Sequence, residues 1–289
     1  MPTVGQLPHQ PFVEQGATGF RWRLGLRPLD LADWFDDGPD ATGWIADKQR
    51  ILTDHAATAF AVLDDIEPES AEVAIAIAEH LTARAGTTIE LPADQHPLEA
   101  ASRLVAEDLV LMVVRGGGLV VGGGSVCFPN RWDLRSKLGR TLREVHAPVA
   151  LLNDQLGDSV DRFLERLAPE RAYWRLGWGI IDVPDGYTPV DGTGPHRPSR
   201  PRPDDLYVRV ERETLRRFPL TDCVLFTIRT YVSPLGVVAR DPLARERIAA
   251  LVDSMPAEVR DYKDLRAIGD DVVRHLRPSG RISPEVDTL

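Results

Sequence analysis

Residues 174–180, 206–211 and 223–231 place apolar side chains at every second position. This alternation is typical of β-strands, in which successive side chains point to opposite faces of a sheet. One face of each predicted strand can pack on a core, so other elements of the chain must cover it. The alternate positions carry polar groups, and if the strands are neighbours these form a wall that contains Arg175, Arg209, Glu211, Arg229 and Tyr231.

This polar wall has two interpretations. It is either a solvated sheet face with ion pairs between neighbouring strands, or the lining of a pocket for an anionic or polar ligand. In the pocket, arginines would hold carboxylates, while a Glu or Tyr would orient or protonate a substrate. Gly177 and Gly179 would leave space for such a ligand. The alternation is compatible with both interpretations.

The rest of the chain supplies further strands and the helices that a sheet needs. An apolar run at 109–114, glycines at 116–118 and a second run at 119–121 predict a β-hairpin, and a further strand covers 172–183. Residues 192–205 are rich in proline and predict a loop. Helical periodicity predicts helices at 45–64, 68–85 (capped by Ser70 and ended by Gly86), 97–107, 133–145, 155–167 and 243–276, the last split near Pro256. This order predicts a single α+β domain around a largely antiparallel sheet.

Charge and composition exclude several classes of function. The formal net charge of −10 disfavours nucleic acid as a partner. No apolar run approaches the roughly 20 residues of a membrane helix, and the first residues lack the pattern of a secretory signal, so we expect a cytoplasmic protein without a membrane partner. Two cysteines cannot supply four thiolates to an iron–sulfur cluster or a cysteine-rich zinc site. Any redox chemistry therefore needs another cofactor.

Three local features of the sequence bear on its chemistry. The glycines at 116–118 and 122–124 are followed by strand-like residues rather than a helix, which favours glycine turns over a phosphate loop. Cys127 has no neighbouring base and is expected to be a buried thiol. The seven histidines show no close helical pair for zinc. His146 stands at the end of a helical pattern before Pro148, and is either a satisfied core residue or a single axial ligand of a metal.

An ordered series of motifs makes the chain recognisable. They are Arg21-Trp-Arg-Leu-Gly-Leu-Arg-Pro-Leu, Glu107-Asp-Leu-Val-Leu-Met, Cys127-Phe-Pro-Asn-Arg-Trp-Asp, Lys137-Leu-Gly-Arg-Thr-Leu-Arg-Glu-Val-His-Ala-Pro-Val, Arg209-Val-Glu-Arg-Glu-Thr-Leu-Arg-Arg-Phe-Pro and Leu225-Phe-Thr-Ile-Arg-Thr-Tyr-Val. Together, from about Phe20 to Arg266, they resemble the haem-dependent oxidative N-demethylase family, which includes the haem subunit of bacterial dimethylamine monooxygenase.

The resemblance implies a haem-binding, PAS-like antiparallel sheet with added helices over 20–276, flanked by an N-terminal extension at 1–19 and a tail at 277–289. It implies a haem b monooxygenase, an oxidoreductase that uses O2 to convert a small secondary amine such as dimethylamine to a primary amine and formaldehyde. Electrons would come from NADPH through FMN and iron–sulfur centres on partner subunits of a reductase, in an oligomeric or multi-subunit complex. The alternatives are a PAS-like haem or gas sensor without turnover, and a haem-free small-molecule binder.

The resemblance also assigns roles to residues. It makes His146 the proximal ligand of haem iron, and it makes Lys137 and Arg175 candidates to hold the haem propionates. The substrate pocket would be formed by Arg209, Glu211, Arg229 and Tyr231. The chain departs from the family pattern at Gly177, where an Asn is expected, and at Glu213, where a Gln is expected. These departures put dimethylamine itself in doubt as the substrate.

Overall fold

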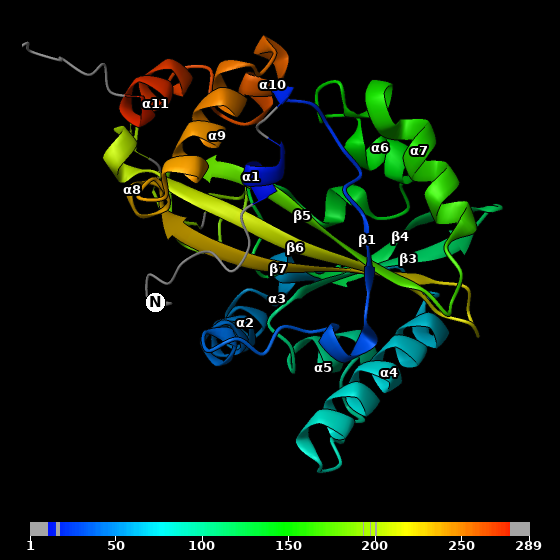
Figure 1. The fold of residues 1–289 in the computed structure, drawn as a ribbon. Helices are drawn as coiled ribbons and strands as arrows, with labels where there is room; N and C mark the ends of the chain where they lie inside the picture. The colour runs from blue at the N-terminus through cyan, green and yellow to red at the C-terminus, as the bar shows by residue number, and fades with distance from the viewer. Residues whose placement is uncertain (1–10, 16–17, 193, 197, 200, 278–289) are drawn as a thin grey trace, which may run out of the picture.

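The computed structural model describes residues 11–15, 18–192, 194–196, 198–199 and 201–277. Its centre is a seven-stranded sheet in the order β1-β5-β6-β7-β3-β4-β2, and every neighbouring pair is antiparallel (Figure 1). The strands are β1 (Arg27–Leu29), β2 (Phe60–Val62), β3 (Asp108–Arg115), β4 (Gly118–Ser125), β5 (Ala172–Ile181), β6 (Tyr207–Arg217) and β7 (Val224–Pro234). The predicted α+β class and antiparallel sheet are thus confirmed.

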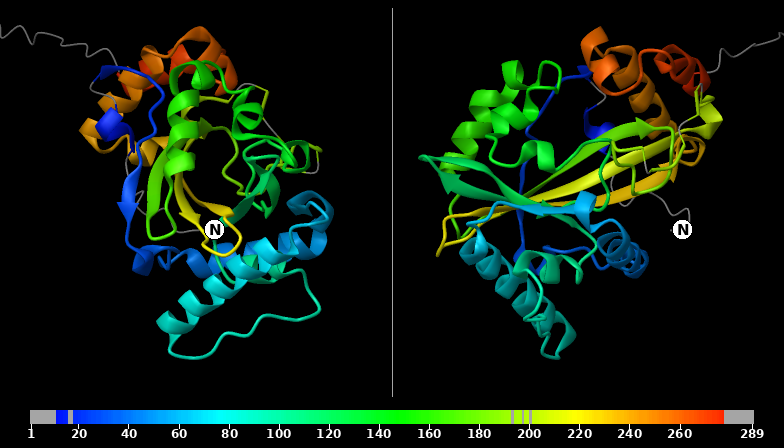
Figure 2. Two further views of the ribbon diagram at one scale, coloured as in Figure 1. Left: turned by 90° about the vertical axis from the view of Figure 1, so that its right-hand side faces the viewer. Right: turned by 180° about the vertical axis from the view of Figure 1, so that it is seen from behind.

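Helices surround this sheet: in the view of Figure 1, α2, α4 and α5 lie below it and α6 and α7 above it, while α8–α11 gather at one end of β5, β6 and β7 (Figures 1 and 2). Among the described helices, none combines the length and apolarity needed to cross a lipid bilayer. The helices are α1 (Pro11–Gln15), α2 (Ala41–Asp54), α3 (Ala56–Ala59), α4 (Glu67–Ala85), α5 (Pro97–Ser102), α6 (Leu142–His146), α7 (Leu152–Arg166), α8 (Leu235–Val238), α9 (Pro242–Asp253), α10 (Ala257–Tyr262) and α11 (Gly269–Leu276).

The strands twist along their length, so a single face of the sheet meets different helices at its two ends. Near Leu225 this face packs in one apolar cluster with α4 and α5, and near Val208 it packs in another with α9 and α11. The opposite face meets α7 near Leu215 and Val224. Between these covered regions lies the middle of β5 and β6, which carries most of the polar residues that were predicted to form a wall.

The predicted helices are confirmed in part. Helix α4 ends at Gly86, whose φ of 69° is left-handed, and the C-terminal helices divide at Pro256 as expected. The helix predicted over 45–64 is wrong at its end, because residues 60–62 pair with β4 as strand β2. The predicted helix over 133–145 is also wrong: only a 3-10 turn (Arg135–Lys137) and the short α6 form there. Ser70 lies buried inside α4 and does not cap it.

The N-terminal residues that the structure describes join the core. Phe12 of α1 is fully buried and contacts Trp178 edge to face, with 5.9 Å between ring centroids. It also belongs to the apolar cluster that contains α9. The rest of the expected extension, residues 1–10, and the tail beyond Arg277 lie outside the described residues.

The predicted hairpin is confirmed as β3 and β4, joined by Gly116 and Gly117 with φ of 59° and 84°. Positive φ at both central residues defines the turn type that matches strand twist, and glycine adopts it without strain. Gly122–Gly124 lie within β4 rather than in a turn. There, a Cβ on Gly124 would come within 2.6 Å of the Leu109 carbonyl oxygen. The glycine is therefore needed for close approach of two backbones.

We expect Gly124→Ala to lower the free energy of unfolding by about 3 kcal/mol, because the atom in the way is backbone and cannot rotate aside. Gly118→Ala is the control on the same strand, since a Cβ there meets nothing within 4 Å. Urea unfolding of both variants checks this. Equal stability of the two variants would contradict the packing argument.

Candidate functional site

The register of the strands divides the expected polar wall between two faces of the sheet. Glu211 lies opposite Gly177 on β5 and opposite Thr230 on β7, while Arg209 lies opposite Gly179. Directly opposite residues point to the same face. Arg175, Arg209 and Glu211 therefore share a face, which Glu213 joins because it lies opposite Arg175.

Arg229 and Tyr231 lie on the other face, so the expectation that all five residues form one wall is wrong. Arg229 is fully buried, with Nε 3.0 Å from Asp36 and a terminal nitrogen 2.9 Å from Asp40. The Tyr231 hydroxyl donates to Asp36 at 3.0 Å, and burial raises the pKa of this phenol far above its usual value. In this structure the two residues fasten the 36–40 segment to β7.

Gly177 is the centre of the shared polar face. A Cβ on this residue would lie 2.8 Å from Glu213 Oε1 and 3.6 Å from Glu211 Oε2. The two carboxylates, here called the glutamate pair, therefore converge over a position without a side chain. Neither of these two oxygens accepts a hydrogen bond from a described residue, whereas Glu211 Oε1 accepts from Arg209. The arrangement is a small acidic cradle with two open acceptors.

The two glutamates differ in their surroundings. The Glu211 side chain is 28% exposed and the Glu213 side chain 14%. Burial raises the pKa of the Glu213 carboxyl, the neighbouring Arg175 guanidinium at 3.3 Å opposes the rise, and the charge of Glu211 adds to it. Glu213 can thus hold a proton at a higher pH than an ordinary glutamate.

Arg209 connects the glutamate pair to the protein interior. It is 3% exposed, and it donates to Glu211 Oε1 at 2.8 Å, to the Phe128 carbonyl at 2.6 Å and to Thr230 Oγ1 at 3.0 Å. These three bonds fix the guanidinium. They consequently fix the Glu211 carboxylate that it holds.

The turn that holds Arg209 is itself fixed by a buried carboxylate. Asp108 accepts from the backbone N–H groups of Cys127 and Phe128 at 2.8 and 2.9 Å. The ammonium of Lys48 lies 3.9 Å from Asp108, and both side chains are almost fully buried. Cys127 is a buried free thiol, as expected, and burial raises its pKa to about 12. A thiolate is therefore not available at this position near neutral pH.

His146 ends the short helix α6, whose start is fixed by a capping box between Thr141 and Glu144. Burial lowers the pKa of the His146 imidazole to about 4, and the positive charges of Arg175 and Lys137 add to this. The ring is therefore neutral at physiological pH, and no described residue hydrogen-bonds to its nitrogens. The structure thus brings His146, Lys137 and Arg175 into one electrostatic group.

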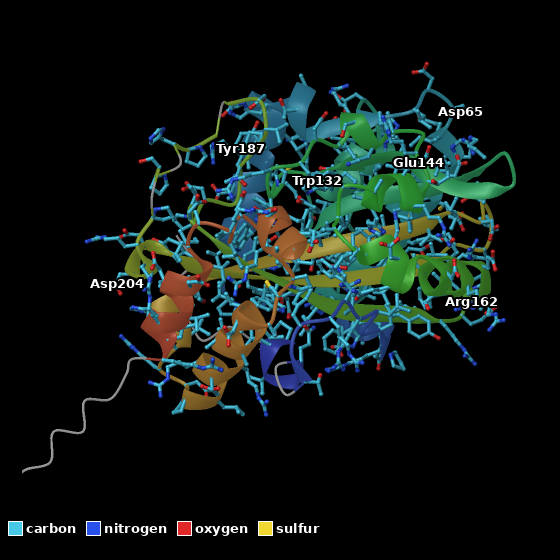
Figure 3. The ribbon with its side chains drawn as sticks, turned by 90° about the horizontal axis from the view of Figure 1, so that it is seen from above. Asp65, Trp132, Glu144, Arg162, Tyr187 and Asp204 are labelled. Carbon is cyan, nitrogen blue, oxygen red and sulfur yellow. The ribbon has the colours of Figure 1, made fainter. Side chains whose placement is uncertain are left out.

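Apolar side chains surround this group without closing over it. Trp132, Leu138 and Val145 are partly buried and pack, with Phe226, on a cluster at the β3–β4 side of the sheet. Figure 3 views this side of the molecule, with Trp132 and with Glu144 of α6 labelled. Gly177 and the residues of β5 just before it are half-buried, and a Cβ added to Gly179 would meet no atom within 4 Å. The sheet face between α6 and the part of β5 that follows Trp174, where β1 no longer pairs with it, is therefore accessible to a ligand.

A separate cavity of about 470 Å³ lies at the far end of β5. Its lining contains three aspartates and two arginines: Arg131 pairs with Asp182 and Asp264, and Arg266 pairs with Asp261. The lining includes neither His146 nor the glutamate pair. The candidate site is therefore built on these residues and not on this cavity.

Several of these residues carry little signal in the sequence. Glu213 was noticed only as a departure from a motif, although its place two residues after Glu211 on a strand puts both on one face. Asp108 lies in the motif Glu107-Asp-Leu-Val-Leu-Met, but the residues that it contacts are distant in sequence, so the motif does not reveal its role. Lys263, described below, follows a short helix whose pattern carries no signal of a site.

This part of the sheet thus combines a neutral histidine, two cations that act on it electrostatically and a half-buried strand face. A family model described as "Haem-dependent oxidative N-demethylase, alpha subunit-like" matches residues 25–273, most of the chain. The chain belongs to this family, which confirms the resemblance drawn from its motifs. The family is one of haem-dependent oxidoreductases, and its name indicates one subunit of a larger assembly.

We expect Asp108→Asn to lower the free energy of unfolding by about 3 kcal/mol, because the buried Lys48 would lose its nearest carboxylate. The control is Asp65→Asn, whose exposed carboxylate pairs with Arg115 and should change stability by less than about 0.5 kcal/mol. Denaturant unfolding measures both. A small effect at Asp108 would contradict the argument that this carboxylate stabilises the buried ammonium.

Proposed function

We propose that this protein is the haem subunit of an oxidative N-demethylase that uses haem b and O2. It would remove a methyl group from a small secondary amine, with electrons supplied from NADPH through FMN and iron–sulfur centres on partner subunits. Balanced, one methylated amine, O2, two electrons and two protons give the demethylated amine, formaldehyde and water. The observation that carries the proposal is His146, neutral and unbonded beside two cations and an uncovered sheet face.

The residues present fit a haem. A neutral imidazole is the form that binds iron, and within the described part of the chain no hydrogen bond to the His146 ring would have to be displaced. Lys137 and Arg175 supply the cations that haem propionates need. Gly179 leaves space beside β5, because a Cβ there would meet no atom within 4 Å, and the half-buried Trp132, Val145 and Phe226 supply apolar contact for a porphyrin. We take the sheet with its added helices, over 20–276, as a PAS-like haem domain.

The glutamate pair fits the amine. A secondary ammonium carries two N–H donors, and the open oxygens of Glu211 and Glu213 converge over Gly177 as two acceptors. Arg209 orients Glu211, while Arg175 orients Glu213, so the cradle is held before the ligand arrives. Glu213, with its raised pKa, can accept a proton at Oε1 as the amine is neutralised. Bound haem would supply the activation of O2 and the oxidation of the methyl group.

We predict that His146→Ala loses haem. The protein is expressed with a haem precursor, and the Soret band is recorded before and after dithionite and carbon monoxide. The wild type should show a band that shifts with each addition, and the variant should lack it, because no other described residue offers a neutral imidazole at this face. His275→Ala is the control, since His275 is exposed on α11 near Asp204.

The outcomes separate the candidate functions. A colourless wild type that takes up no haem in vitro would refute the proposal. A haem protein that releases no formaldehyde from any amine, with a competent reductase present, would instead favour a sensor. Haem retained in His146→Ala would place the ligand elsewhere.

We predict that Glu213→Gln changes the pH dependence of amine binding. Burial raises the Glu213 pKa, so on acidification this carboxylate is neutralised earlier than an ordinary glutamate and stops attracting the ammonium. Wild-type affinity should therefore fall as the pH falls through the raised pKa of Glu213. The variant should bind more weakly near neutral pH and lose this component of the fall.

Dimethylammonium titrated against the haem spectrum over a pH series measures this. Glu258→Gln is the matched control, because Glu258 is exposed on α10 and should leave the profile unchanged. A variant profile that coincides with the wild type would exclude Glu213 from the amine site.

A further inference from the structure

Lys263, which follows α10, lies at the edge of the candidate site. Its ammonium donates to the Trp178 carbonyl oxygen at 3.0 Å. Trp178 stands between Gly177 and Gly179, the two glycines of the open face. Strand β1 pairs only with residues 172–174, so no described strand covers this edge of β5 beyond Trp174. The lysine therefore lies beside the strip of sheet over which the glutamate pair converges.

Two indole rings hold the ammonium in place. Lys263 Nζ lies 5.3 Å from the Trp22 ring centroid and 5.7 Å from that of Trp178, distances typical of cation–π contacts. Trp22 is itself fixed, because its indole N–H donates to the Ala150 carbonyl at 2.8 Å. The long side chain is thus ordered, which lowers the entropy lost when it binds a ligand.

Among the described residues, Lys263 makes no close ion pair. Glu211 is paired with Arg209, and Glu213 is paired with Arg175. No carboxylate of the described residues lies within 4.0 Å of Lys263 Nζ, and one of its three donors is used. Burial lowers the pKa of Lys263 to about 8, with Glu211 opposing and Arg175 adding to the effect. A partly buried cation of this kind is stabilised by an anion from outside the chain.

We propose that the substrate is an amine that also carries a carboxylate, with its ammonium on the glutamate pair and its carboxylate on Lys263. This inference rests on the proposed function and narrows its substrate class from simple amines to N-methylated amino acids. Lys263 is then a specificity-determining residue, held ready between Trp22 and Trp178.

The test compares two probes that differ in the group at one end: N-methylglycine, which carries a carboxylate, and its amide, in which an uncharged carboxamide of similar size replaces the carboxylate. Each is titrated at neutral pH into the haem-loaded full chain, and binding is followed by the haem spectrum. Tryptophan fluorescence of the haem-free chain gives a second readout, because Trp22 and Trp178 flank the ammonium. We expect N-methylglycine to bind at least about tenfold more tightly than the amide, the size of one charge-assisted hydrogen bond.

Two variants locate the effect. Lys263→Met keeps the apolar stem against the indoles and should bring the ratio of the two affinities close to one. Arg266→Met, which removes an exposed charge three residues further on, should leave the ratio unchanged. Lys263→Arg should keep part of the preference, because it retains the charge.

Equal affinity of the two probes in the wild type would overturn the inference, and this comparison needs no variant. Loss of haem in Lys263→Met would also overturn it, since the lysine would then serve the cofactor. If dimethylammonium binds in a Glu211-dependent manner while N-methylglycine shows no advantage, the inference fails and the proposed function stands. If neither haem nor any amine binds, both fail.

Discussion

The pairing of β6 with β5 determines which charges of this protein meet. Because Glu211 lies opposite Gly177 and Glu213 lies opposite Arg175, two carboxylates and two guanidinium groups share one face, and a glycine lies between them. A shift of this register by one residue would send the same side chains to the opposite face. The long antiparallel ladder from Ala172 to Ile181 fixes the register and therefore the site.

Buried polar contacts extend this constraint into the interior. A continuous series of ionic and hydrogen-bonded neighbours runs from the core to the candidate site. It consists of Lys48, Asp108, the backbone of the Cys127–Phe128 turn, Arg209 and Glu211. Buried charges of this kind cost free energy to desolvate, so they contribute geometry more than stability. The Glu211 carboxylate is thereby held from the side of the protein core, while its other oxygen remains open toward the ligand space.

The sequence predicted those parts that depend on local chemistry. Alternation placed Arg209 and Glu211 correctly on one face, and the glycine at 86 and the proline at 256 marked where helices end. The register between two neighbouring strands decides which of their side chains share a face, and the alternation within one strand does not reveal that register. This is why Arg229 and Tyr231 were grouped with Glu211 but bind Asp36 on the other side. The strand at 60–62 was missed for a related reason, since its partner β4 is distant in sequence.

Because the Glu213 carboxylate lies directly over Gly177, the residue types that positions 177 and 213 can hold depend on each other. Any side chain at 177 would claim the space that the Glu213 carboxylate now occupies. A related chain with a larger residue at 177 must therefore keep residue 213 in another rotamer or of another type, and intermediates with only one change would be disfavoured. The two positions are therefore expected to covary between relatives.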